Sequence, residues 1–333
     1  MRRVLLILFF IFVARFVQAQ YVPNSGQSFQ FYSMFNPAFS GVDEFTTIRL
    51  GYGYRWAGFA GAPKSINLSY NTRIIKPLDL STNSLRLSNL SAVKTPKSKQ
   101  IALGLGMNVF QTTYGPVETV GGSVNLSMHY PLSKKVKIAA GLTMLVENTK
   151  FDLSKITFRN DAEEKNTDYY KSLVANGSSK ANLNLRGGFL IYAPKFYLGF
   201  SYFPLFETSI QNASIDESNP SVYSGSVQAG YSIEFSPDFT VKPSVSGLLI
   251  ANGGVNMDYN VKAYIQKSSW VGVSYRDIKA AVISVGFNIN YLLTASYSYE
   301  RSFGKFRTFN DGSHELILSL RLNNFKKQAP YTW

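Results

Sequence analysis

FTTIRLGYGYRWAGFAGAPKSINLSYNTRI, residues 45–74, contains two runs in which apolar and polar side chains alternate. Alternation with a period of two indicates β-strands, because successive side chains of a strand point to opposite faces. Each run is about ten residues long, the length with which a tilted strand crosses a membrane. The larger side chains of one face are those of Ile48, Leu50, Tyr52, Tyr54, Ile66, Leu68, Tyr70, Thr72 and Ile74. The segment therefore predicts a hairpin of two such strands joined by a tight loop.

The opposite face of this hairpin consists of Gly, Ser, Asn and occasional Arg residues. A soluble sandwich usually carries Lys, Glu and Thr on the strand face that meets water. A membrane barrel instead turns its apolar face to lipid and lines a hydrated lumen with polar side chains. We therefore predict a membrane barrel, with the soluble sandwich as the alternative.

The chain begins with a basic start, a short apolar run and a small-residue cleavage site, MRRVLLILFFIFVARFVQAQ. This pattern is typical of a secretory signal peptide, which we place at residues 1–19. A membrane-spanning helix is the alternative, but the apolar run is too short and is interrupted by Arg15. With 45% hydrophobic and 15% aromatic residues, an exported chain must hide its apolar surface, and a closed barrel does so.

The 333-residue chain has a formal net charge of +14 and no cysteine. The lack of cysteine excludes disulfides and thiolate metal sites. A basic balance often indicates nucleic-acid binding, but an exported protein rarely meets nucleic acid, so we expect no such partner. The Arg and Lys side chains are expected to line the lumen, to face anionic headgroups of outer-membrane lipid, or to meet an acidic partner.

Strand patterns recur along the rest of the chain without a change of character. They lie at 101–109, 120–130, 135–146, 181–192, 196–203, 222–235, 239–250, 256–265, 270–275, 281–289, 291–300 and 315–322. With the first hairpin, this predicts an all-β fold: a transmembrane antiparallel up-and-down β-barrel of about 14 strands over residues 45–322. Residues 20–44 are expected to be an irregular segment, either periplasmic or a plug in the lumen. Residues 323–333 are expected to be a C-terminal tail.

One connection, residues 76–99, lacks alternation and is strongly basic. Its cations are Lys76, Arg86, Lys94, Lys97 and Lys99, against the single acid Asp79. Strand parity places this long loop on the periplasmic side, where outer-membrane barrels keep their turns short. Either a strand pair is hidden there or the loop contacts a periplasmic partner.

Candidates for catalysis and metal binding are few. His129 shares the polar face of its strand with Ser123, Asn125 and Ser127, which could form a hydrolase site, but a polar row filling the lumen explains them more simply. A long outward loop carries Asp161, Glu163, Glu164 and Asp168. Calcium binding is conceivable there, although interleaved lysines favour a solvated loop. We predict no catalytic residue, no metal site and no cofactor.

Three motifs carry a resemblance to a known family. They are NPAFSG at 36–41, YRWAGFAGAPK at 54–64 and GSHELIL at 312–318. Together they resemble the PorP/SprF family, with the matching residues Asn36, Pro37, Trp56, Gly58, Gly61, Pro63, Ser313, His314 and Glu315. The chain departs from the family pattern in having Arg55 directly before Trp56, Ala57 after it, and Ser65 where Thr is usual.

This resemblance implies a non-enzymatic outer-membrane barrel of the type IX secretion system. Such barrels take part in export or surface attachment of large adhesins, in some members those used for gliding motility. The implied partners are a large secreted adhesin and other periplasmic or outer-membrane components of the secretion system. The alternative function is an outer-membrane channel or transporter for small or hydrophobic solutes.

The seam between the last and first strands is expected to carry a charge cluster. If strand 315–322 runs beside strand 45–55, Glu315 faces the lumen near the level at which Arg55 arrives. Glu300 ends the preceding strand on its polar face. Because an unpaired charge is costly where water is scarce, we predict an ion pair of Arg55 with Glu315 or Glu300.

Overall fold

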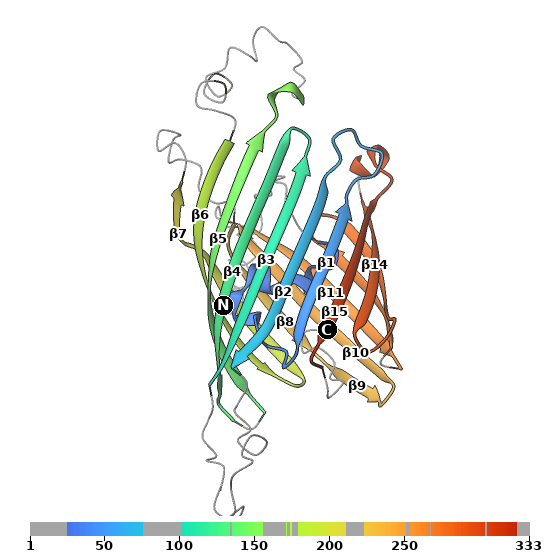
Figure 1. The fold of residues 1–333 in the computed structure, drawn as a ribbon. Helices are drawn as coiled ribbons and strands as arrows, with labels where there is room; N and C mark the ends of the chain where they lie inside the picture. Colours follow the sequence, from blue (N-terminus) through green and yellow to red (C-terminus); the bar gives the residue numbers. More distant parts are fainter. Residues whose placement is uncertain are drawn as a thin grey trace, which may run out of the picture.

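The computed structural model describes part of the chain. The described residues are 25–75, 101–133, 135–155, 171, 174, 179–210, 223–250, 254–266, 268–303 and 305–324. Their strands form one antiparallel sheet (Figure 1). The strands are β1 Thr46–Tyr54, β2 Lys64–Ile75, β3 Ala102–Tyr114, β4 Val117–Pro131, β5 Lys137–Phe151, β6 Ser179–Ala193, β7 Phe196–Ser209, β8 Tyr223–Tyr231, β9 Ile233–Ser236, β10 Phe239–Ile250, β11 Val255–Ile265, β12 Ser269–Arg276, β13 Ala280–Asn288, β14 Leu293–Ser302 and β15 Ser313–Leu322.

The sheet closes on itself through three pairings. β15 pairs with β1, and β10 pairs with both β8 and β11, so a continuous ladder runs round the molecule. β9 is a short additional strand that follows β8 after Ser232 and pairs with the first residues of β10. The closed barrel therefore has 14 strands and one extra segment, which confirms the predicted fold class and strand number.

The two faces of the barrel are opposite in character to those of a soluble protein. On the first hairpin Leu50 and Leu68 are exposed, whereas Arg49 and Ser69, their neighbours in sequence, are buried. The same alternation of exposed apolar and buried polar side chains recurs on β4 and β12. The outer surface thus suits lipid, as expected for a membrane barrel. None of the helices in the described part of the chain has the length and hydropathy to cross a bilayer.

The two ends of the barrel differ. One end, here called the turn end, has the short connections at 132–136, 194–195, 237–238 and 289–292. The other, the loop end, has the longer connections at 55–63, 152–178, 210–222 and 303–312. Outer-membrane barrels keep short turns on the periplasmic side, so we assign the turn end to the periplasm. Several sequence predictions fall outside the described residues, namely those for residues 1–19, for Lys76, Arg86, Lys94, Lys97 and Lys99, for Asp161, Glu163, Glu164 and Asp168, and for most of the C-terminal tail.

Residues 25–44, here called the plug, lie inside the barrel (Figure 1). They form the short helices η1 Ser28–Phe31, α2 Tyr32–Phe35 and η2 Pro37–Phe39. The sequence left open whether this segment is periplasmic or within the lumen, and its hydrogen bonds to six strands of the wall (β2, β4, β7, β8, β14 and β15) place it in the lumen. An apolar core forms between plug and wall from Phe29, Tyr32, Phe39, Tyr192, Tyr197 and Trp270, with smaller neighbours.

Candidate functional site

The NPAFSG motif fixes the plug to the wall through Asn36. The Asn36 side chain is fully buried, and its Oδ1 accepts a hydrogen bond from Ala38 N at 3.0 Å, which caps η2. Its Nδ2 donates to Phe189 O at 3.2 Å and to Gln228 Oε1 at 3.1 Å. Pro37 occupies the first turn of η2, where the missing N–H costs nothing. One side chain therefore both starts the helix and joins it to β6 and β8.

Ser40 joins the plug to β4. Its carbonyl oxygen accepts a hydrogen bond from Ser127 Oγ at 2.5 Å and lies 2.8 Å from His129 Nε2. His129 Nδ1 lies 2.9 Å from the Tyr192 hydroxyl, so both ring nitrogens have partners within the protein. This arrangement serves packing between plug and wall, in agreement with the simpler reading of the polar row on this strand.

Glycines of the wall make room for the same motif. A Cβ at Gly104 would lie 2.1 Å from Ser40 O, and a Cβ at Gly188 would lie 2.1 Å from Asn36 Oδ1. Both distances are far below van der Waals contact, so any side chain at these positions would displace the plug. Glycine on the polar strand face is thus explained by the close approach of a second segment.

Arg73 holds the end of the plug near the turn end. Its Nε donates to Gly41 O and its Nη2 to Val42 O, each at 2.9 Å. Gly41 has a φ of +72°, which residues with a side chain rarely adopt. Its ideal Cβ would also lie 2.5 Å from the Gly104 backbone. The last residue of the motif therefore has to be glycine for the chain to turn toward β1.

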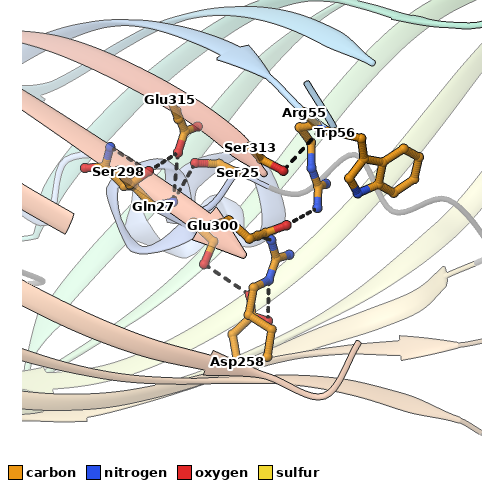
Figure 2. Close-up of polar contacts among 11 residues, drawn as sticks. Ser25, Gln27, Arg55, Trp56, Asp258, Ser298, Glu300, Ser313 and Glu315 are labelled. Carbon is orange, nitrogen blue, oxygen red and sulfur yellow. Dashed lines mark hydrogen bonds and ion pairs between the residues drawn. The ribbon is translucent and has the colours of Figure 1, made fainter. Parts of the chain in front are cut away.

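At the loop end, a network of four charges crosses the barrel seam. Arg55 Nη2 lies 3.0 Å from Glu300 Oε1, and Arg276 Nη1 lies 2.5 Å from Glu300 Oε2. Arg276 Nε lies 3.1 Å from Asp258 Oδ1. All four side chains are nearly buried, and their charges alternate from β11 through β12 and β14 to the end of β1. Figure 2 shows Arg55 and Glu300 pointing toward one another across the seam.

Strand register explains why Arg55 meets Glu300 and not Glu315. Gly53 pairs with Glu315 across the seam, so Arg55 arrives two residues beyond Glu315, at the level of Ser313. Glu300 pairs with Ser313 and hence lies at that level on the next strand. Two residues of strand correspond to roughly 7 Å. The small Ser313 side chain leaves Arg55 free to reach over β15.

Glu315 contacts the plug instead. Its Oε2 accepts hydrogen bonds from Gln27 N at 2.9 Å and from Ser298 Oγ at 3.4 Å (Figure 2). Gln30 Nε2 donates to Ser296 Oγ at 2.9 Å on the same strand, β14. The third residue of the predicted seam cluster thus holds the beginning of the plug, and Arg276 and Asp258 complete the charge network in its place.

The other two motifs meet each other at the loop end. Ala57 N donates to Gly312 O, and Asp311 N donates to Ala57 O, each at 2.7 Å. Trp56 N lies 3.3 Å from Ser313 Oγ, and Arg55 N donates to Pro63 O at 2.8 Å. The hairpin loop after β1 is therefore bound to the approach to β15.

Three further motif residues shape this contact. Gly58 and Gly61 have φ values of +84° and +74°, and Gly61 O accepts a hydrogen bond from Gly115 N at 3.0 Å. His314 Nδ1 lies 2.7 Å from the Tyr297 hydroxyl on β14. Residues that are far apart in sequence thus close the barrel at one point of the seam.

The motif geometry agrees with a comparison against protein families. Residues 17–320 match the family described as type IX secretion system membrane protein PorP/SprF. The chain belongs to the PorP/SprF family. This confirms the resemblance seen in the motifs and places the protein in the outer membrane. As a PorP/SprF protein it is a membrane component associated with type IX secretion, which is consistent with a role other than catalysis.

Comparison with curated proteins finds no matching sequence. Among solved structures, the Pseudomonas putida toluene transporter TodX is 10% identical with a TM-score of 0.47, and the match covers 92% of this chain and 95% of TodX. The Acinetobacter baumannii outer membrane protein Omp33 is 9% identical with a TM-score of 0.45, and the match covers 85% of this chain and 100% of Omp33. These similarities say nothing about what this PorP/SprF protein binds.

Sequence reasoning missed Asp258 and Arg276. Both lie on the polar face of their strands, and they are direct partners across β11 and β12. The alternation signal would have placed each of them in the lumen, but only the register brings them to Glu300. Within the described residues, no group of three or more His, Asp and Glu side chains is arranged to hold a metal ion.

Proposed function

We propose that this protein is a non-enzymatic accessory of the type IX secretion system that supports export or surface anchoring of one large adhesin. Membership of the PorP/SprF family supports the secretion role. The occupied lumen supports an accessory role, because the plug fills the space through which a polypeptide would otherwise pass. The cavities found between plug and wall have room for about one water molecule each. The protein would then act by binding its partners at its surfaces.

A deletion strain tests this proposal. Removing the protein should strip one large adhesin from the cell surface and leave other exported proteins in place. If the client is a gliding adhesin, spreading on agar should stop as well. Quantitative surface proteomics of deletion and complemented strains measures this, and unchanged display of every large secreted protein would contradict the proposal.

The rival function, a channel for small or hydrophobic solutes, makes a different prediction in planar bilayers. A plugged accessory barrel should show no steady conductance, whereas a variant lacking residues 25–42 should conduct because its polar lumen is then open. Steady conductance of the intact protein, together with solute uptake that depends on it, would favour the channel.

We also propose that the basic loop at residues 76–99 contacts an acidic periplasmic partner. The loop combines Lys76, Arg86, Lys94, Lys97 and Lys99 with one acid, and it joins two strands at the turn end. Exchanging its lysines for serine should weaken co-purification of the partner at physiological salt and leave the barrel folded. Exchanging Lys150 and Lys155, which lie at the loop end, is the matched control. Equal recovery of the partner with the loop variant and the wild type would refute the contact.

A further inference from the structure

The barrel wall is interrupted near the turn end, between β8 and β10. Ser244 of β10 pairs with Gly230 of β8, and Val241 pairs with Ile233 of β9. Between these pairs, Lys242 and Pro243 have no ladder partners on the side of β8 and β9, although both pair with β11 on the other side. Proline lacks the N–H that a regular ladder needs, and Ser232 N donates to Lys195 O at 2.7 Å instead. The wall therefore has a local gap in its backbone pairing.

A small cavity lies at this interruption. Lysines from three parts of the chain line it: Lys195 from the turn between β6 and β7, Lys242 from β10 and Lys262 from β11. The hydroxyl-bearing residues Ser232 and Ser244 line it as well. The cavity has room for about one water molecule. Its lining therefore combines cations with hydroxyl groups, and both can donate hydrogen bonds to an anion.

Lys262 is the most unusual of these residues. Its side chain is only 4% exposed, and Nζ has no hydrogen-bond partner among the residues that the structure describes. The ammonium lies 3.9 Å from the ring centre of Phe29 in the plug and 4.4 Å from that of Trp270. Aromatic faces offset part of the cost of burying a cation, but an ammonium has three donors that remain unused.

Lys242 increases the positive charge at the same point. It is the direct partner of Lys262 across β10 and β11, and like charges opposite one another destabilise a strand pair. Asp43 of the plug and Glu234 of β9 interact electrostatically with Lys242, while Arg49 adds a further positive charge near Lys262. An anion in the cavity would supply Lys262 with the partner that it lacks.

Part of the cavity lining belongs to the outer surface of the barrel. Lys195 and Phe196 are exposed at the turn between β6 and β7, and the exposed Tyr231 lines the cavity too. Aromatic side chains at the ends of barrel strands lie at the level of lipid headgroups. A headgroup phosphate in the periplasmic leaflet would lie at this height.

We propose that this cavity binds a phosphate group, carried by a phospholipid headgroup or by free phosphate. One phosphate oxygen enters the gap between Ser232 and Pro243 and accepts from Lys262, while Lys242 and Lys195 neutralise the remaining charge. Lysine binds phosphate as a compact point charge, which suits a cavity with room for one oxygen. The wall interruption is therefore a built anion site and not a defect in pairing.

Calorimetric titration of the purified full-length protein in detergent tests the site. The probes are short-chain phosphatidylglycerol, the phosphate-free short-chain diacylglycerol, and inorganic phosphate. Phosphatidylglycerol should bind and diacylglycerol should not at the same concentrations. Lys262→Met and Lys242→Met should each weaken phosphatidylglycerol binding at least about tenfold, because each removes a charged donor. Lys150→Met, an exposed lysine at the loop end, should leave binding unchanged.

The two sources of phosphate give different results that both support the site. Phosphatidylglycerol binding at least about tenfold tighter than inorganic phosphate assigns it to lipid, and equal affinities assign it to the free ion. If the variants at the buried lysines fail to fold, Lys195→Met still tests the site, because Lys195 is exposed. This variant should weaken binding severalfold. Equal binding of diacylglycerol and phosphatidylglycerol, or unchanged binding in the lysine variants, would overturn the proposal.

Discussion

Individual residues matter most at the seam, where Arg55, Arg276, Asp258 and Glu300 form an alternating row of buried charges. Burying such a row gives little net stability, because desolvation offsets the attraction between the charges. Removing one member is strongly destabilising, because its partners then remain buried as uncompensated charges. We therefore expect the network to fix the register of the strands around the closure and to change the free energy of unfolding mainly when one member is removed.

Arg276→Met should destabilise the barrel more than Arg55→Met. Arg276 contacts both Asp258 and Glu300, so its loss leaves one carboxylate unpaired and weakens the other; the expected cost is about 3–5 kcal/mol. Arg55 contacts Glu300, which keeps Arg276 as a partner, so a loss of about 1–3 kcal/mol is expected. Urea unfolding in micelles, followed by tryptophan fluorescence, measures both.

The control for this comparison is Arg307→Met, an exposed arginine on the short helix η4 Lys305–Phe309. It should change the unfolding free energy by no more than about 0.5 kcal/mol. Equal effects of Arg276→Met and Arg55→Met would show that Arg276 does not connect the two carboxylates in solution.

Part of this charge network could be predicted from the sequence. Arg55 and Glu300 could be proposed as partners because both end strands on the polar face near the seam. The place of Glu315 could not be predicted, since a shift of two residues in register decides whether it meets Arg55 or the plug. Asp258 and Arg276 show the same limit: alternation gives the face of a side chain but not its level along the barrel.

The plug accounts for features of the wall that the strands alone do not explain. The NPAFSG motif is short and irregular, and its role is visible only against the wall that receives it. Gly104 and Gly188 accommodate Ser40 and Asn36, and the polar side chains of β4 satisfy the carbonyl oxygens of the plug. The sequence could suggest that these glycines allow another segment to approach closely in the lumen, but it could not show which segment does so.

Gly188→Ala and Gly104→Ala should release the plug. The new Cβ atoms would overlap Asn36 Oδ1 and Ser40 O, and the latter belongs to backbone that cannot rotate away. The chain has no native cysteine, so Ser33→Cys, at a buried position in the plug, reports release by maleimide labelling. Labelling should be slow in the parent and at least about tenfold faster with either glycine variant, which corresponds to about 1.4 kcal/mol of lost docking free energy.

Gly122→Ala is the matched control in the same wall. A Cβ there would meet Asn108 O at 3.7 Å, which is ordinary contact, so labelling of Ser33→Cys should stay slow. Fast labelling in the parent, or no acceleration by either glycine variant, would show that the plug is not held in the lumen as described.

The barrel architecture was the most predictable property of the molecule. The same alternation recurs within each strand of the barrel. The number of strands and the residues that face the lumen could therefore be predicted from residues 45–322 without any tertiary information. The filled lumen could not be predicted, because it depends on long-range contacts of the plug, whose sequence shows no alternation of apolar and polar residues. The barrel therefore has a hydrophobic core inside, between plug and wall, and an apolar, lipid-facing surface outside.

We propose that this plugged barrel serves secretion by binding a large exported client. The most direct measurement is a gentle-detergent pull-down of the tagged protein from its own cells, with the co-purified proteins quantified by mass spectrometry against an unrelated tagged outer-membrane barrel. We predict that one large secreted adhesin is enriched in near-equal amount, together with components of the type IX secretion system. Recovery of the barrel with no secreted protein above the control would contradict the account.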